Sequence, residues 1–400
     1  MATPRLLLRR RALKGLLLCA TVLATASVAR ATEPTRGVTD SEIVVGTYTD
    51  LSGVTAMWGV NNSDAIRMAF DAQNAKGGIN GRKIKYIVED NQYQVPRSVQ
   101  AANKLINRDH VFLMIANGGT PMNNATMPEQ LEKGVPNMFP LTSARSMYEP
   151  YHRLKFGLVS SYYDQMRAAV KYMVEKKGKK ALCAMYQDTD FGRDVMDGVR
   201  DQMKAMNLTL AGETAHKPTD ADFSASVARL RDVKCDVIFL GTIVRDTNQI
   251  VAAVRKIGWD VDLMAQVAAY DSAVAEVPGG VTEGLLCMTS VQFLSPDDPH
   301  PAVQAFIKNY KDRFGREPNF AAQIGYTAAE IVIEGLKNAG RNLTLDSFIT
   351  GMEAVKGYKD IFGAPEMSFG PNIRQGSNMS LVAVVKGGKW NLAETNAVGY

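Results

Sequence analysis

The stretch that decides the fold runs from Glu42 to Asp90 and reads EIVVGTYTDLSGVTAMWGVNNSDAIRMAFDAQNAKGGINGRKIKYIVED. Its apolar start, at 43–45, predicts a strand, and a polar loop follows. Small and apolar residues then recur at i, i+3, i+4 and i+7, which is typical of a helix with one buried face. These residues are Ala65, Met68, Ala69 and Ala72. The run 83–88 predicts a second strand, so the stretch forms one βαβ unit, whose crossover should be right-handed.

The ends of this helix are marked by residues that favour helix termini. Asn62, Ser63 and Asp64 are N-cap candidates, because their side chains can accept hydrogen bonds from free backbone N–H groups. Gly77 and Gly78 supply a stop, since glycine readily adopts the left-handed conformation that ends a helix. We therefore expect the helix to lie between these two groups.

The rest of the chain alternates helical and strand patterns. Helices are predicted at 96–107, 121–133, 164–176, 191–206, 223–230 and 247–257, and strands at 111–115, 135–139, 181–185 and 237–240. Pro128 should kink or shorten the helix that contains it. Apolar strands that alternate with amphipathic helices indicate an α/β protein with parallel sheets covered on both faces. The length favours two domains.

Residues 1–31 have the pattern of a secretory signal peptide. A basic start precedes an apolar run at 16–23 and a small-x-small cleavage site at 29–31, and the run is too short to span a membrane. The ordinary secretion route is expected, with a twin-arginine signal, suggested by the arginines at 9–11, as the alternative. The leader holds six of the 46 basic residues and none of the 41 acidic ones, so the remaining chain has a net charge of −1 instead of +5. No nucleic-acid or anionic-membrane partner follows from that charge.

Three cysteines remain after the leader, and they leave two interpretations open. Cys183, Cys235 and Cys287 each lie in or beside an apolar run. One disulfide can form among three cysteines, but a disulfide framework cannot. Alternatively, all three act as small buried hydrophobic residues.

The opening stretch resembles the first unit of a known family. The matching segments are 51–53 (LSG), 75–82 (AKGGINGR) and 89–90 (ED), and they resemble periplasmic substrate-binding proteins that serve ABC importers of the branched-chain amino acid type. Weaker matches follow along nearly the whole chain, at 187–192, 222–224, 236–238, 283–286 and 325–326. The family's first-lobe disulfide cannot form, because Gln92 and the stretch 117–119 stand where relatives carry its two cysteines.

The resemblance implies two doubly wound parallel-sheet lobes joined by a hinge that the chain crosses three times. The crossings are expected near Phe156, Ser290 and Gly370. The first lobe then comprises residues 42–156 plus 291–370, and the second comprises 157–290 plus 371–400. The ligand of this family lies between the lobes, at the carboxyl ends of the strands.

Two loops and one aromatic residue of the first lobe are expected to contact a ligand. In the loop 117–121, Gly119 and Thr120 precede a helix, with Thr120 as its N-cap, and free N–H groups there favour a carboxylate. In the loop 140–143, Leu141 would offer backbone groups and Ser143 its hydroxyl. Trp58 falls where some relatives place a ring over the ligand. The alternative is that these loops are an ordinary cap and an ordinary turn.

In the second lobe the sequence departs from the amino-acid binders of the family. Phe191 stands where they usually carry tyrosine, and Ile243 or Val244 replaces another tyrosine. Val267 stands where they carry a glutamate that pairs with the ligand's ammonium group. Tyr270 is a further expected contact. The alternative is that Phe191 and Val267 are core residues.

These replacements imply a ligand without an ammonium group. A buried ammonium without a partner costs several kcal/mol, so an α-amino acid would need Asp271 or Asp190 as a substitute partner. The resemblance thus implies an aromatic or apolar carboxylic acid. The alternative is a branched-chain or other amino acid.

The chain lacks the motifs of common enzymes. It has no GxSxG, GxxxxGK[ST], HExxH or paired CxxC, and its four histidines are scattered. Asp188 and Asp190 could be metal ligands, but a turn before Phe191 explains them more simply. We expect a monomeric periplasmic binding protein without catalytic residues, cofactor or metal, which closes around its ligand and docks on the membrane permease of an ABC importer. A sensor that presents its ligand to a membrane receptor is the alternative.

Overall fold

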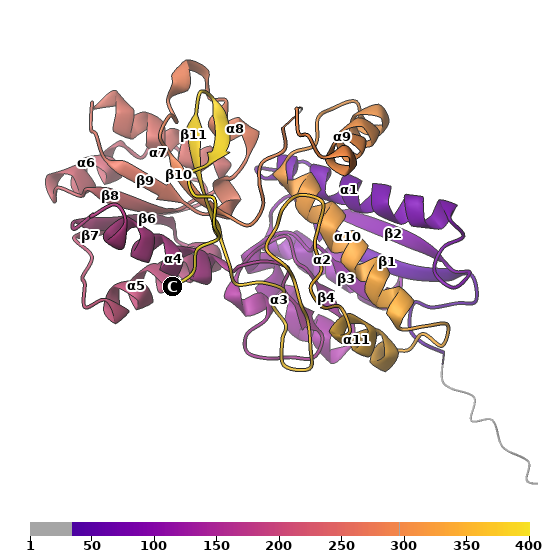
Figure 1. The fold of residues 1–400 in the computed structure, drawn as a ribbon. Coiled ribbons are helices and arrows are strands. Elements are labelled where there is room, and N and C mark those ends of the chain that lie inside the picture. Colours follow the sequence, from indigo (N-terminus) through magenta and orange to yellow (C-terminus); the bar gives the residue numbers. More distant parts are fainter. Residues whose placement is uncertain (1–33, 296) are drawn as a thin grey trace, which may run out of the picture. The chain divides into compact units, whose positions relative to one another are not determined.

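The computed structural model describes residues 34–295 and 297–400 as two α/β lobes (Figure 1). The predicted signal peptide at 1–31 lies outside the described residues. The first sheet has the strand order β2-β1-β3-β4-β5, and every neighbouring pair is parallel. Its strands are β1 (Glu42–Thr49), β2 (Lys83–Asp90), β3 (Leu113–Ile115), β4 (Asn137–Met138) and β5 (Lys155–Phe156).

Helices cover both faces of this sheet because successive residues of a strand point to opposite faces. Ile43 and Val45 of β1 belong to one apolar core, whereas Val44 and Tyr48 pack in the other. The helix α1 packs against α10, which packs against α11, while α2 packs against α3. These helices are α1 (Ala56–Ala75), α2 (Val95–Asn107), α3 (Thr120–Glu132), α10 (Phe320–Asn338) and α11 (Leu345–Glu353), and α9 (Pro301–Phe314) also contacts α1.

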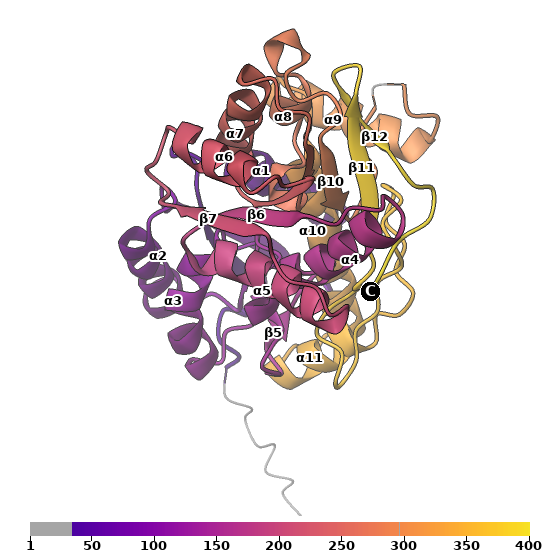
Figure 2. The same cartoon turned by 90° about the vertical axis from the view of Figure 1, so that its left-hand side faces the viewer.

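The second sheet has the order β12-β11-β10-β9-β8-β6-β7, and Figure 2 labels the strands at its two ends, β12 and β11 at one and β6 and β7 at the other. It is parallel except at one edge, where β10 pairs with β11 and β11 with β12 in antiparallel register. The strands are β6 (Leu182–Gln187), β7 (Gly212–His216), β8 (Val237–Gly241), β9 (Asp262–Ala265), β10 (Leu286–Thr289), β11 (Leu381–Lys386) and β12 (Lys389–Leu392). Its helices are α4 (Tyr162–Glu175), α5 (Asp190–Ala205), α6 (Ser224–Asp232), α7 (Val244–Lys256) and α8 (Ser272–Ala275).

The chain passes between the two lobes three times: after β5, after β10, when it forms α9, α10 and α11 beside the first sheet, and before β11. Two of these passages are bonded side by side. Gly157 donates its N–H to the carbonyl of Arg374 at 2.7 Å, and Gly376 donates to the carbonyl of Gly157 at 3.0 Å. Backbone bonds therefore tie together the passages that a hinge would use.

The βαβ unit is confirmed, but its predicted N-cap is wrong. The helix α1 begins at Ala56, so Asn62, Ser63 and Asp64 lie inside it. Their polar groups serve tertiary contacts instead: Asn62 Nδ2 donates to the carbonyl of Ala321 at 3.0 Å, and Asp64 pairs with Arg316. The stop is confirmed, because α1 ends at Ala75, ahead of two glycines with positive φ.

The effect predicted for Pro128 on helix length is also wrong, since α3 continues through this residue to Glu132. The residues around the proline are buried, among them Thr126, Met127 and Gln130. Tertiary packing supplies most of a helix's stability in a protein, and here it outweighs the loss of one backbone hydrogen bond.

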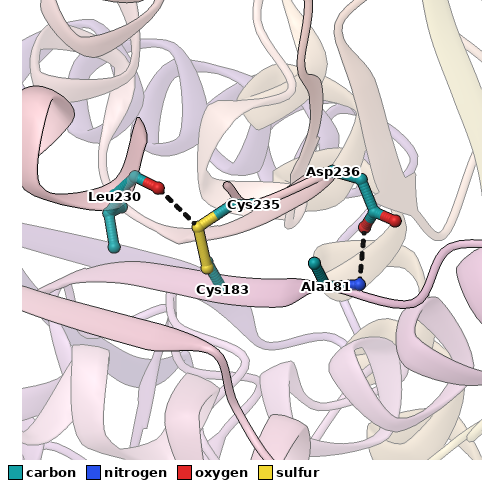
Figure 3. Close-up of a disulfide and its surroundings, with 5 residues drawn as sticks. All are labelled: Ala181, Cys183, Leu230, Cys235 and Asp236. Carbon is teal, nitrogen blue, oxygen red and sulfur yellow. Dashed lines mark hydrogen bonds between the residues drawn. A yellow bond between two sulfur atoms is a disulfide. The ribbon is translucent and has the colours of Figure 1, made fainter. Parts of the chain in front are cut away.

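The cysteines divide between the two interpretations left open by the sequence. Cys183 on β6 and Cys235, just before β8, form a disulfide, whereas Cys287 is free and buried (Figure 3). Next to the disulfide, the Asp236 carboxylate accepts the N–H of Ala181 at 3.1 Å (Figure 3). Both contacts fasten the start of β8 to β6. None of the described helices combines the length and the apolar character needed to cross a bilayer.

Candidate ligand-binding site

A cavity of about 90 Å³ lies between the two lobes. Loops that follow β1, β2, β3 and β4 line it from the first lobe, together with the start of α10. The first residues of α4, α5 and α7 and the short helix η2 (Val267–Ala269) line it from the second lobe. The cavity is therefore at the carboxyl ends of the parallel strands, where open α/β sheets place their ligands.

Nine of the ten sequence-predicted residues line this cavity. They are Trp58, Gly119, Thr120, Leu141, Ser143, Phe191, Ile243, Val244 and Val267. Tyr270 does not line it. The ring of Tyr270 is fully buried behind the cavity, where it contacts Phe293, Phe320 and Trp390 with centroids 5.1–5.4 Å apart. Since Phe320 lines the cavity, Tyr270 supports the wall from behind.

Hydroxyl groups gather at the first-lobe end of the cavity. The hydroxyls of Thr120 and Thr142 lie 2.6 Å apart. The N-cap of α3 is Gly119, with φ 88°, so the predicted capping role of Thr120 is wrong and its hydroxyl faces Thr142 instead. Within the described residues, the backbone N–H of Thr120 and the hydroxyl of Ser143 have no hydrogen-bond partner. These groups are donors that an anionic head group can use.

The backbone of Leu141 does not offer the free groups expected of it. Its N–H donates to the carbonyl of Asn117 at 2.9 Å, and its carbonyl accepts the N–H of Gly119 at 3.3 Å. These bonds join the loops 117–121 and 140–143 through a parallel bridge between Gly118 and Leu141. Leu141 therefore contributes its side chain to the cavity wall and holds the loop of Gly119 in place.

The described part of the cavity wall carries one carboxylate and no basic side chain. Asp50 is its single acidic residue, and no lysine, arginine or histidine lines it. The Asp50 carboxylate accepts four hydrogen bonds: from the N–H groups of Ser52 at 3.2 Å and Gly53 at 2.5 Å, and from the N–H and hydroxyl of Thr55 at 2.8 Å each. These hydrogen bonds therefore hold the loop that contains Val54 in its conformation.

Neither of the two aspartates considered as substitute ammonium partners lines the cavity. Asp271 caps α8 and accepts from Asn319 Nδ2 at 2.8 Å, and burial raises the pKa of this carboxyl. Asp190 accepts from Asn124 Nδ2 at 2.9 Å and from Arg193 at 3.3 Å.

Aromatic rings supply another part of the wall. The rings of Trp58 and Phe320 meet edge to face at 5.5 Å, and those of Tyr162 and Phe191 at 5.0 Å. Phe191 reaches the wall because Gly192 lets α5 approach the end of β6, where a Cβ would lie 1.8 Å from the carbonyl of Gln187. An aliphatic or aromatic ligand body fits such a surface.

Sequence reasoning missed several wall residues, among them Tyr93, Thr142, Tyr148 and Tyr162. Tyr93 and its neighbour Gln92 both have positive φ, which places this turn in a region unusual for residues with side chains. No sequence pattern marks that conformation. Tyr162 could have been found, because the Ser161 capping box fixes the start of α4 directly before it.

The cavity lies between two α/β lobes at the carboxyl ends of their strands, which is where such sheets generally place a small ligand. The comparisons with known proteins give the family. A family model described as periplasmic binding protein matches residues 42–389, and the chain belongs to this family.

Individual relatives are similar at low identity. The chain is 23% identical to the leucine-specific-binding protein of Salmonella typhimurium over 78% of its own length and 83% of the relative. It superposes with a TM-score of 0.81 on a branched chain amino acid ABC transporter structure from Thermus thermophilus with bound valine, at 16% identity over 91% and 98% of the two chains. The same TM-score is found for a fatty acid ABC transporter substrate-binding protein from Thermomonospora curvata, at 23% identity over 92% and 95%.

Proposed function

We propose that this chain is the periplasmic substrate-binding component of an ABC importer, and that its cavity holds a small ligand with one carboxylate and an apolar body. The observation that carries this proposal is that the hydroxyls of Thr120, Thr142 and Ser143 gather in one part of the wall, while rings and aliphatic side chains supply much of the rest. Family membership and the names of the relatives support the transport role.

The names of the relatives favour an aliphatic amino acid as the ligand. Both the leucine-specific relative and the valine-bound structure point to that class, which is the alternative drawn from the sequence. The aromatic acid of the main sequence interpretation has no counterpart in these names. A branched-chain amino acid is therefore the first ligand to test.

A specific observation favours a second candidate, an apolar carboxylic acid without an ammonium group. The Asp50 carboxylate already accepts four hydrogen bonds, and Val267 occupies the place expected to hold an ammonium partner. An ammonium group in this cavity would lose its water, and the one carboxylate in the described wall, Asp50, already accepts four hydrogen bonds from its own loop. The substrate-binding protein from Thermomonospora curvata is named for a fatty acid, which belongs to this second class.

The proposed mechanism is hinge closure. Residues 42–156 plus 291–370 would move as one lobe and 157–290 plus 371–400 as the other, with the bonded passages at Gly157 and Arg374 between them. A ligand that contacts both lobes favours the closed state by its differential affinity. The closed monomer would then dock on the importer's permease, whereas a membrane receptor would replace the permease if the protein is a sensor.

A matched pair of ligands tests the proposal. Leucine and 4-methylpentanoate share one carbon skeleton and carboxylate and differ in the amino group. Each is titrated into the protein by calorimetry, with glycine as the control that lacks the apolar body. Stoichiometric binding of either compound, without binding of glycine, is the expected result, and which one binds more tightly decides between the candidates. Binding of neither these two nor 3-phenylpropanoate would contradict the proposal.

A further inference from the structure

The loop between β2 and α2 brings a phenol hydroxyl to the cavity, on Tyr93. Within the described residues this hydroxyl makes no hydrogen bond, and its oxygen is open to solvent. By contrast, the hydroxyl of Tyr148, another wall residue, donates to Ser161 Oγ at 3.1 Å and to Asp164 at 3.4 Å. The Tyr93 hydroxyl is therefore a polar group of the wall that the fold itself leaves unused.

The turn that carries Tyr93 has an unusual backbone conformation. Gln92 and Tyr93 have φ of 51° and 54°, in the left-handed region that is strained for residues with side chains. Two neighbouring side chains hold this turn: the Asp90 carboxylate accepts the N–H of Gln92 at 3.0 Å, and Asn91 Oδ1 accepts the N–H of Tyr93 at 3.0 Å. Such strain persists only where the surrounding structure fixes it, and it concentrates at ligand-binding sites. The conformation thus agrees with a binding role for Tyr93.

Two contacts place the Tyr93 ring beside the hydroxyl-rich part of the wall. Its Cε2, the ring carbon next to the one that bears the hydroxyl, lies 3.1 Å from the position that a Cβ on Gly119 would take. Asn91 is fully buried and joins the two loops, because its Nδ2 donates to the carbonyl of Gly118 at 3.4 Å. Gly119 is the N-cap of α3 and directly precedes Thr120, whose backbone N–H the described residues leave unpaired. The Tyr93 hydroxyl therefore lies at the same end of the cavity as the free donor of Thr120.

An anionic head group in this cavity needs neutral donors, because no lysine, arginine or histidine lines the described wall. Several neutral donors together stabilise a carboxylate without a cation. A phenol hydroxyl suits this task, since its hydrogen bond to an ionised oxygen is short and strong. Burial raises the pKa of Tyr93, and the nearby Tyr162, Asp246 and Asp50 raise it further, so the hydroxyl keeps its proton for donation.

We propose that Tyr93 is a ligand-binding residue whose hydroxyl donates to the ligand's carboxylate, beside the backbone N–H of Thr120 and the hydroxyl of Ser143. This inference rests on the proposed function and names a residue that selects acids over their neutral analogues. A neutral analogue gains less from the contact, because hydrogen bonds to charged groups are about twice as strong as those between neutral groups.

Removing only the hydroxyl tests this inference. Y93F keeps the ring, and Y86F is the matched control, because Tyr86 on β2 does not line the cavity. Leucine or 4-methylpentanoate, whichever binds, is titrated into the parent, Y93F and Y86F by calorimetry. Y93F should bind the acid about 30-fold more weakly, which corresponds to about 2 kcal/mol and to the loss of one hydrogen bond to a charged group. Y86F should bind as the parent does.

The matching amide separates a contact with the carboxylate from a contact with the body of the ligand. Leucinamide or 4-methylpentanamide should lose only about 5-fold in affinity on the change to Y93F, so the preference for acid over amide should fall by about 6-fold. Equal losses for acid and amide, or an acid affinity of Y93F that equals that of the parent, would overturn the inference and leave the binding function intact.

If neither acid binds the parent, urea unfolding without ligand gives the answer. A hydroxyl that serves a ligand adds nothing to the fold, so Y93F should unfold at the same urea concentration as the parent. Y48F is the reference for a structural hydroxyl, because Tyr48 is buried and its hydroxyl lies 2.6 Å from that of Thr126. An unchanged midpoint for Y93F beside a lowered one for Y48F would support the inference, and equal destabilisation of the two variants would overturn it.

Discussion

Replacing Val267 by glutamate should raise the affinity of the cavity for α-amino acids. Val267 is 4% exposed and lines the cavity at the start of η2, and its backbone N–H is already bound by Gln165 Oε1 at 3.0 Å. The V267E carboxylate would therefore lie in the wall without a cation. A leucine ammonium group would supply that cation, and each group would remove the desolvation cost of the other.

The expected magnitude follows from that cost. An unpaired ammonium in a dry site costs several kcal/mol, and recovery of about 3 kcal/mol tightens leucine binding by roughly 100-fold. For 4-methylpentanoate the sign is opposite, because the new carboxylate repels the ligand's own. The assay is calorimetry at pH 7 with both ligands on the parent, V267E and the neutral control V267Q.

Refutation would take one of two forms. If leucine binds the parent as tightly as it binds V267E, the cavity already pairs the ammonium group and the reasoning from Val267 and Asp50 is wrong. If V267Q gains as much leucine affinity as V267E, the effect comes from added hydrogen bonding and not from charge.

Two further predictions concern the scaffold. Removing the disulfide with C183S and C235S together should lower the free energy of unfolding by about 4 kcal/mol, because the bond closes a loop of 52 residues. Urea unfolding of the double variant measures this loss. A loss under about 1 kcal/mol would show that the bond does not constrain the unfolded chain. G192A should abolish ligand binding or folding, because its Cβ would lie 1.8 Å from the Gln187 carbonyl. In the matched control G399A the added Cβ meets its nearest atom at 3.5 Å, so this variant should behave as the parent in circular dichroism and calorimetry. Normal binding by G192A would contradict the packing argument.

The parts of the fold that could be predicted are those set by local periodicity. The apolar alternation at β1 and the spacing in α1 identify a βαβ unit without knowledge of the rest of the chain. The N-terminus of α1 could not be placed in this way, because the polarity of Asn62 and Asp64 is used in contacts with Ala321 and Arg316, more than 200 residues away.

The same distinction applies to the site. Loops at strand ends can be located from the sequence, so most of the expected wall residues do lie at the cavity. Tyr270 does not line the cavity, because the ring of Phe320 lies between it and the wall, and residue spacing in the sequence does not reveal such a layer. Tyr93 was missed because the left-handed turn that places it has no sequence signal. Which cysteine pairs with Cys183 depends on how close the residues lie in the fold, so the sequence alone could not decide whether a disulfide forms or between which residues.

The central claim, that the ligand of the calorimetric titration lies in this cavity, is tested most directly by tryptophan fluorescence. Trp58 lines the cavity, whereas Trp259 and Trp390 do not. Titration with leucine or 4-methylpentanoate should change the emission of the parent with the calorimetric Kd, and W58F should lose this change while still binding in the calorimeter. An emission change that W58F retains in full would place the ligand elsewhere and contradict the account.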